Sequence, residues 1–222
     1  MGDASPRATV HLVPTLHQYH LAVPGYGFDA LTRVLDALRP DVLLCELSER
    51  ALRERRPQVV RQEYQHSVFP YLARRGIPAV ALEPGGDLWD ELVTRALEAE
   101  QQFKDLAPAR HADHERRLHA MLGNLLRSWD SPAAVDSART ELVFEEKHAR
   151  ENELFGAAYR ENWNRWNEHF AQTIGRTAQA HPGQRIVALA GVEHGYWLRR
   201  RLRELATAAG TWTLASRLDG KD

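Results

Sequence analysis

Hydrophobic residues fall into two kinds of pattern along this chain. Short apolar runs cover residues 8–16, 42–46, 77–82, 185–190 and 211–215. Unbroken runs of this length are typical of parallel strands buried on both faces. Between them, apolar residues recur every three or four positions, which is the spacing of an amphipathic helix. The order strand, helix, strand, helix, strand over the first 82 residues predicts parallel pairing with right-handed crossovers.

Helices are expected around these strands. The first covers 28–39, and Pro40 ends it because proline disfavours a helical conformation in the preceding residue. A polar helical region, of one helix or two, covers 49–75. A last helix runs from His194 to about residue 209.

The third and fourth strands are separated by about 100 residues, far more than a crossover needs. Amphipathic faces within this stretch predict a helical insertion at about 88–180. We therefore expect one α/β domain over residues 1–222, with a mostly parallel sheet of about five strands flanked by helices. The insertion would lie over the catalytic edge of the sheet. Its aromatic stripe is more often core than binding surface, but we expect some rings to line a substrate channel: Tyr159, Trp163 and Trp166.

Composition narrows the functional class only slightly. Apolar residues make up 43% and charged residues 27% of the chain, as in ordinary globular proteins. The net charge of -1 gives no electrostatic reason to expect nucleic acid. No apolar run approaches the roughly 20 residues that span a bilayer, and the first residues lack an apolar signal core. We expect a cytoplasmic protein with no membrane partner, and a homo-oligomer is left open.

Ionisable residues follow several of the predicted strands. His17, Glu46 and His194 end three of them, although the two histidines are about 180 residues apart. The carboxyl ends of parallel strands meet at one edge of a sheet, where ligands bind. Imidazole and carboxylate groups bind divalent transition metals such as Mn, Zn or Co, and an open position on the metal activates water. The pattern predicts a metal site in which His17 and His194 are ligands and Glu46 is a ligand or the general base.

Further residues could complete this site. Glu83 ends the third strand and is a candidate fourth ligand or general base. Arg50 could hold a substrate carboxylate, stabilise an oxyanion or neutralise Glu46. His20, in the loop after His17, is a candidate for binding or orienting substrate. The competing interpretation is that each histidine is a hydrogen-bonded structural residue and that the carboxylates serve helix ends.

Other chemistries find little support in the sequence. There is no Gly-Xaa-Ser-Xaa-Gly nucleophile elbow and no glycine-rich phosphate loop of either common kind. The single cysteine, Cys45, lies in an apolar strand and is expected to be buried and inert. His111 and His114 lie in a charged stretch and are expected to face solvent.

Three short motifs, in order and spacing, resemble the TraB/PrgY–GumN–Tiki family, within the wider group of ChaN and erythromycin-esterase-like proteins. The family's opening strand ends Gly-Thr-Xaa-His, its second strand ends in Glu-Leu followed by Arg, and a late strand ends Gly-Xaa-Xaa-His. The matching segments here are Pro14-Thr15-Leu16-His17, with proline in place of the glycine, Pro40–Leu47 with Arg50, and Gly191-Val192-Glu193-His194. The resemblance covers the sheet and not the helical block from about 90 to 155.

The resemblance implies a metal-dependent hydrolase of a peptide or amide bond, because Tiki proteins are metalloproteases that use these histidines and the strand glutamate. Two alternatives stay open. One is a metal-free esterase of the erythromycin-esterase type, in which a histidine and a glutamate activate water directly. The other is a non-catalytic haem- or peptide-binding protein on the same scaffold. The expected partner is a peptide or a small amide or ester substrate.

Overall fold

The computed structural model describes residues 6–218 and 220, and within them five strands form one parallel sheet. The strands are β1 (Ala8–Thr15), β2 (Val42–Cys45), β3 (Ala79–Ala81), β4 (Arg185–Gly191) and β5 (Trp212–Leu214). Their order in space is β3-β2-β4-β1-β5, with every pair parallel. This confirms the predicted α/β class and the strand positions, to within a few residues at the ends.

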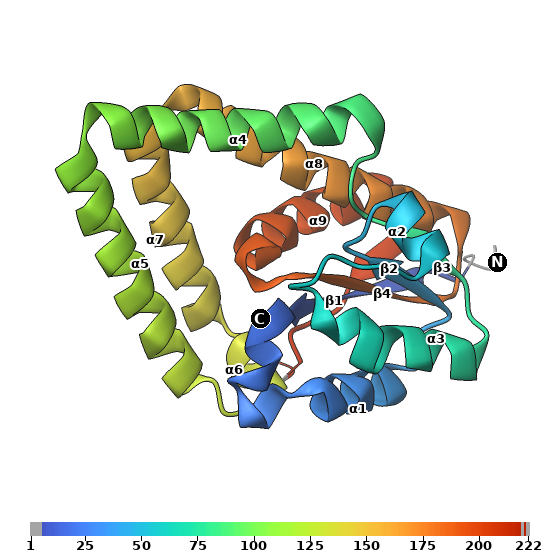
Figure 1. Cartoon of the computed structure of the whole chain (residues 1–222). Helices are drawn as coiled ribbons and strands as arrows, with labels where there is room; N and C mark the ends of the chain where they lie inside the picture. Colours follow the sequence, from blue (N-terminus) through green and yellow to red (C-terminus); the bar gives the residue numbers. More distant parts are fainter. Residues whose placement is uncertain (1–5, 219, 221–222) are drawn as a thin grey trace.

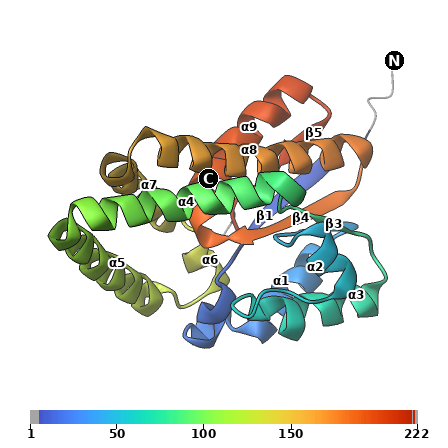
Figure 2. The ribbon, with the colours of Figure 1, turned by 45° about the horizontal axis from the view of Figure 1, so that its top comes forward.

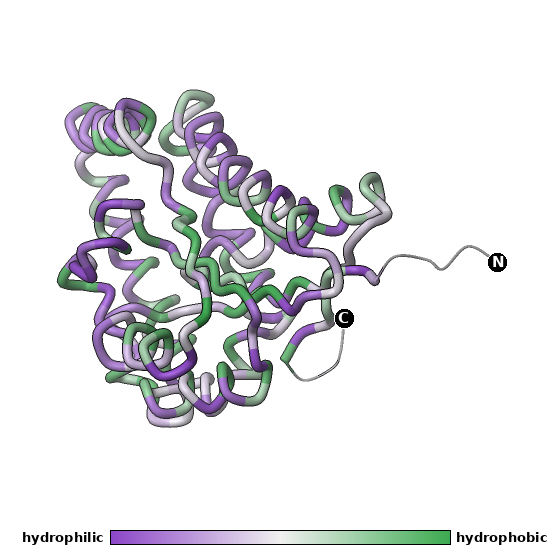
Figure 3. Tube along the Cα trace, turned by 90° about the vertical axis from the view of Figure 1, so that its right-hand side faces the viewer, coloured by the Kyte–Doolittle hydropathy of each residue, from purple (hydrophilic) through white to green (hydrophobic). Residues whose placement is uncertain are grey.

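Both faces of the three central strands, β2, β4 and β1, are largely buried, which explains why these strands are apolar runs in the sequence. One set of strand residues, including Val13, Leu43 and Leu189, packs into the core on one face. The alternate set, including Val10, Leu44 and Ala188, packs on the opposite face. The strands accordingly form a hydrophobic centre with more polar helices around it (Figure 3). Alternating side chains of a strand face opposite sides, so continuous apolar runs require a cover on each side.

Short helices cover the first face. They are α1 (Phe28–Leu38), α2 (Glu49–Glu54), a π-helical turn (Tyr64–Val68) and α3 (Phe69–Arg75). The opposite face is covered by α8 (Ala157–Ala180) and α9 (Gly195–Ala209), which lie on the other side of the sheet in Figure 2. The predicted polar helical region 49–75 is thus two α-helices separated by a loop and a π-helical turn.

The long middle block is helical, as the sequence predicts. It contains α4 (Gly86–Leu106), α5 (Pro108–Ser128), the short α6 (Pro132–Val135) and α7 (Ala138–Phe155). Figure 1 shows α4 running away from the sheet, and α5 and α7 extending beside each other back toward α6. Gly25 fixes where the block meets the first loop, because a side chain there would collide with the backbone of Asp130.

The last helix of the block belongs partly to the sheet. Phe170, Ile174 and Ala178, in the second half of α8, are buried in the core that α8 shares with the strands. The second half of α8 is therefore the crossover helix that leads into β4, and the part that stands apart from the sheet ends before Phe170. No helix among the described residues is long and apolar enough to cross a membrane.

Candidate active site

The register of the sheet brings three strand ends together. β4 lies between β1 and β2, with Thr15 opposite Gly191 and Cys45 opposite Leu189. Glu46 and His17 therefore emerge on either side of the end of β4, and His194 lies on the 3₁₀ turn Val192–His194 that continues it. In the structure, His17 Nε2 lies 3.8 Å and His194 Nε2 lies 3.9 Å from the same oxygen, Glu46 Oε1.

Glu46 is buried and held by cationic and polar donors. Arg61 Nη2 donates to Glu46 Oε1 at 2.8 Å, and Arg61 Nη1 donates to the Glu46 carbonyl. The backbone N–H of Gly191 donates to Glu46 Oε2. Burial would raise the pKa of Glu46, but the Arg61 charge and the other neighbours outweigh it and hold the pKa below its usual value. Glu46 is therefore an ionised carboxylate at neutral pH.

His17 is fixed by a second carboxylate. Its Nδ1 lies 2.8 Å from Glu63 Oε1, which is fully buried. Burial acts to lower the pKa of His17, but the hydrogen bond to Glu63 and the charges of Glu46 and Glu63 raise it above its ordinary value. The backbone of His17 has a φ of 51°, a strained conformation for a residue with a side chain, and such strain collects at functional sites.

The pKa of His194 is shifted in the opposite direction from that of His17. Its Nδ1 lies 2.8 Å from Asn167 Oδ1, and the Asn167 amide nitrogen donates to the Trp163 carbonyl at 2.9 Å. That second bond fixes the amide so that Oδ1 faces the ring, which assigns the proton to His194 Nδ1 and leaves Nε2 with a lone pair. Burial lowers the pKa of His194 to about 4. The Trp163 indole stacks on the ring, with centroids 4.7 Å apart.

A cavity of about 240 Å³ opens at these histidines. Apolar side chains make up much of its wall, from the first loop and from the helical block: Leu16, Leu122, Trp129, Phe144 and Trp163. Thr15 also lines the cavity, and its hydroxyl, which is inaccessible to solvent, has no hydrogen-bond partner among the described residues. The helical block thus covers the edge of the sheet where the two histidines meet.

Gly191 forms the floor between the catalytic candidates. A Cβ at this position would lie 3.1 Å from His17 Nε2, 3.3 Å from Glu46 Oε2 and 3.6 Å from His194 Cδ2. Contacts of 3.0–3.4 Å are tighter than nine in ten real Cβ contacts, so a side chain would require His17 and Glu46 to move by a few tenths of an ångström, whereas the contact with His194 is an ordinary one. The glycine of the Gly-Xaa-Xaa-His segment therefore allows the close approach of His17 and Glu46.

Glu83 joins the site through Arg61. Arg61 Nη2 donates to Glu83 Oε1 at 2.6 Å while it also donates to Glu46. Burial, followed by the negative charge of Glu46, raises the pKa of Glu83 to about 7. Glu83 lies at the strand edge as predicted, but a guanidinium stands between it and Glu46.

Two predicted site residues are placed differently by the structure. The Arg50 side chain is 80% exposed and bonds Glu54 at 3.2 Å, so the cation that neutralises Glu46 is Arg61 and not Arg50. His20 is buried, and its Nε2 accepts from the backbone N–H of Leu16 at 3.0 Å. Its Nδ1 lies 2.5 Å from the Tyr26 carbonyl. Backbone groups thus occupy both nitrogens, and we assign His20 to the structure of the loop.

The three aromatic candidates separate into different roles. Trp163 borders the cavity and lies between His194 and His148, whose ring stacks on it at 4.1 Å. Tyr159 donates to Glu151 at 3.1 Å, and Trp166 packs edge-on against Trp89 at 5.1 Å. Neither of these two rings borders the cavity, so the prediction that they contact substrate has no support in this geometry.

Four contributors to the site were not predicted from the sequence: Thr15, Arg61, Glu63 and Asn167. Arg61 and Glu63 lie in a polar stretch after α2, where no periodicity separates inward from outward residues. Asn167 lies on α8, four positions after Trp163, and is fully buried. Polar residues on the buried side of an amphipathic helix are the one signal that could have found it, because buried polar groups require partners.

The metal prediction can be compared with the donors in this arrangement. Two imidazoles with Nδ1 anchored on oxygen are typical of metal-binding histidines. Glu46, however, already accepts from Arg61 and from the Gly191 N–H, and the guanidinium cation is 2.8 Å from the oxygen that faces both histidines. Nor do ligand atoms of His17, Glu46 and His194 all lie within 4.8 Å of one another. The donor set in this arrangement fits a metal poorly.

One other set of residues in the described chain does meet that spacing: Glu100, His111 and Glu115. It lies where α4 meets α5, away from the strand ends, and Glu100 is exposed. Nearby His114, which the sequence predicts to face solvent, is only 2% exposed and has Nε2 3.5 Å from Glu151 Oε1. That prediction was wrong because His114 lies on the side of α5 that faces α7, where it is close to the Glu151 carboxylate.

Comparisons of the chain with protein-family models, with curated proteins and with solved structures found no match. We therefore interpret the site from its own geometry.

Proposed function

We propose that this chain is a hydrolase that activates water between His194 and Glu46 and cleaves a small ester or amide. The observation that carries the proposal is the position of two imidazole Nε2 atoms, 3.8 and 3.9 Å from one oxygen of an ionised carboxylate, at the base of a small cavity. Opposite pKa shifts on paired groups are typical of an acid and a base that work together.

His194 would act as the general base. Asn167 holds the ring with Nε2 unprotonated, and the lowered pKa keeps it neutral at pH 7. Its Nε2 would take a proton from water as the water oxygen forms a bond to the substrate carbonyl carbon. The negative charge of Glu46 would stabilise the imidazolium that forms, and that proton would then pass to the leaving oxygen or nitrogen as its bond to carbon breaks.

His17 would stabilise the other charge that develops. Its raised pKa favours the protonated ring, so Nε2–H is a donor for the oxyanion of the tetrahedral intermediate. Arg61 would act through Glu46, keeping it ionised and in place, and would not contact the substrate carbonyl.

Cavity size and lining limit the substrate. A volume of about 240 Å³ is below the roughly 300–1,000 Å³ of pockets that enclose drug-sized ligands. The largely apolar wall favours a short acyl group or a single apolar side chain of a peptide.

A metallopeptidase of the type that the resemblance implies is the competing proposal. It is favoured by the anchoring of both histidines through Nδ1, an arrangement shared with metal ligands. A metallopeptidase mechanism would require the hydrogen bond between Arg61 and Glu46 to break before Glu46 could coordinate a metal ion.

The test is hydrolysis of a panel of p-nitrophenyl esters and anilides of increasing acyl length by protein dialysed against a chelator. We expect the short acyl esters to be cleaved, and His194→Ala to lose most of the turnover with an unchanged circular dichroism spectrum. Arg33→Gln, an exposed change on α1, serves as the control. Activity that disappears on chelation and returns with Mn or Zn would favour the metallopeptidase, and no hydrolysis across the panel would contradict both.

A further inference from the structure

A second pocket, of about 540 Å³, lies beside the candidate active site. Its wall comes from the end of β2, from α2 and the loop after it, and from the start of α4. Four arginines line it, Arg50, Arg53, Arg56 and Arg61, against two acidic residues, Glu49 and Asp90. The lining therefore has an excess of positive charge in a molecule whose net charge is -1.

The arginines differ in how far their charge is already compensated. Arg61 is neutralised from behind by Glu46 and Glu83. Arg50 pairs with Glu54 only through Nε, at an exposed contact, and such pairs contribute little. Arg53 and Arg56 form no ion pair within residues 6–218 and 220. Positive charge in this pocket is thus available to a ligand.

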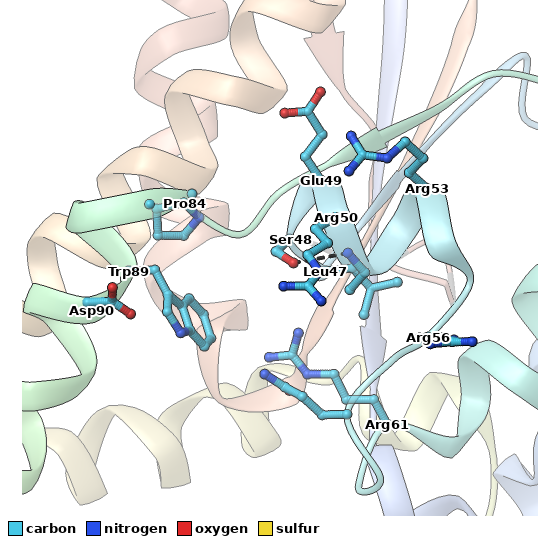
Figure 4. Close-up of a pocket in the computed structure, with 14 residues that line it drawn as sticks. Leu47, Ser48, Glu49, Arg50, Arg53, Arg56, Arg61, Pro84, Trp89 and Asp90 are labelled. Carbon is cyan, nitrogen blue, oxygen red and sulfur yellow. Dashed lines mark hydrogen bonds between the residues drawn. The ribbon is translucent and has the colours of Figure 1, made fainter.

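The pocket also has an aromatic wall. Figure 4 shows the guanidinium groups of Arg50 and Arg61 directed toward the space beside the Trp89 indole, with Arg53 next to Glu49 at the rim. Trp89 is half-buried and its ring packs on Trp166 at 5.1 Å, so it is held in place. Guanidinium groups recognise phosphate and carboxylate through paired N–H donors, and an aromatic face receives a planar or apolar group.

We propose that this pocket binds an organic oxyanion, a phosphate or carboxylate attached to a planar group, with Arg50 and Arg53 supplying charge, Arg61 at the base and Trp89 as the stacking wall. The anion would lie outside the proposed catalytic cavity, since the lining of this pocket contains neither histidine and the lining of that cavity lacks Arg61. The binding site is therefore distinct from the place where we propose hydrolysis.

The test is calorimetric titration at low salt with phenyl phosphate, with benzoate and with phenol. We expect at least one of the two anions to bind and phenol, which lacks the anionic group, not to bind. In the double variant Arg50→Gln/Arg53→Gln, affinity should fall by about tenfold or more, because hydrogen bonds to charged groups are lost. Added salt should weaken binding to the wild type.

The matched control is Arg33→Gln, an exposed arginine on α1 outside the pocket, which should leave affinity unchanged. Benzoate binding with the same arginine dependence identifies a carboxylate ligand, and binding of phenyl phosphate alone identifies a phosphate. No binding of either anion, or equal affinity in wild type and double variant, would overturn the proposal. Because the titration needs no turnover, a failed hydrolysis assay does not affect this result.

Discussion

At the scale of single residues, one guanidinium is shared by two buried carboxyl groups. Arg61 Nη2 lies 2.8 Å from Glu46 Oε1 and 2.6 Å from Glu83 Oε1. Glu46 keeps its charge, and the pKa of Glu83 rises to about 7 because of burial and of that neighbouring charge. Folding therefore becomes less favourable at a pH at which Glu83, the second carboxyl group, is ionised.

This predicts a specific change for Glu83→Gln. The folded-state pKa of about 7 lies above the usual value of 4.5, so the folded protein binds more protons between these two pH values. The Glu83 carboxyl thus lowers the free energy of unfolding as pH rises from about 4.5 to 7. The unfolding free energy of Glu83→Gln minus that of the wild type should therefore increase when the pH is raised from 5 to 8, as measured by urea unfolding.

The control for this measurement is Glu145→Gln, a half-exposed carboxylate on α7 that pairs with Arg200 at 3.6 Å. Its stability difference from wild type should be nearly the same at both pH values. If Glu83→Gln behaved in the same way as this control, Glu83 would not share its charge environment with Glu46.

Arg50 and Arg61 show which parts of the site could be predicted from the sequence and which could not. His17, Glu46, Glu83 and His194 could be placed at one edge because each follows a buried strand. Arg50 follows the same strand as Glu46, yet its exposed side chain on α2 pairs with Glu54 and not with Glu46, whereas Arg61 returns from an irregular loop 15 positions after Glu46. Nothing local distinguishes which arginine turns inward, since that choice depends on the path of the loop.

At the scale of elements, α8 serves two environments. Its first half presents Trp163 and Asn167 to His194, and its second half buries Phe170 and Ile174 against the sheet. The aromatic and apolar spacing predicts the helix and its inner face. The spacing does not predict which part of that face packs against the sheet and which part faces the site, because core residues and site residues follow the same helical period.

Substitutions in the two halves of α8 should therefore have different consequences. Trp163→Leu removes the ring stacked on His194, so we expect kcat for a cleaved ester to fall by about tenfold or more as the base loses its orientation. Trp163→Phe, which keeps a stacking ring, should recover part of the loss. Ile174→Ala should lower the unfolding free energy by about 2–5 kcal/mol with unchanged kinetic constants.

A Trp163→Leu variant with lower stability but wild-type kcat and KM would mean that the ring only packs the helices. That outcome would leave the substrate-facing surface of the block unassigned.

At the scale of the whole molecule, the parallel sheet brings the candidate site residues to one edge, and the helical block covers that edge. The sheet could be predicted because its strands are short apolar runs with a fixed chain order. The cavity could not, because its wall combines Leu16, Leu122, Phe144 and Trp163 from segments far apart in the chain. The position of the block against the first loop depends on such contacts as the close approach of Gly25 to Asp130, which hydrophobic periodicity does not predict.

The central claim is that His17 and His194 are an acid and a base beside one carboxylate. Ring-nitrogen NMR of protein containing ¹⁵N-labelled histidine, with signals assigned through His17→Asn and His194→Asn, measures this directly and needs no substrate. We predict that His194 carries its proton on Nδ1 and stays neutral down to about pH 4, while His17 remains protonated above the ordinary value of 6.5. Titration of both rings near 6.5, or a proton on His194 Nε2, would contradict the account.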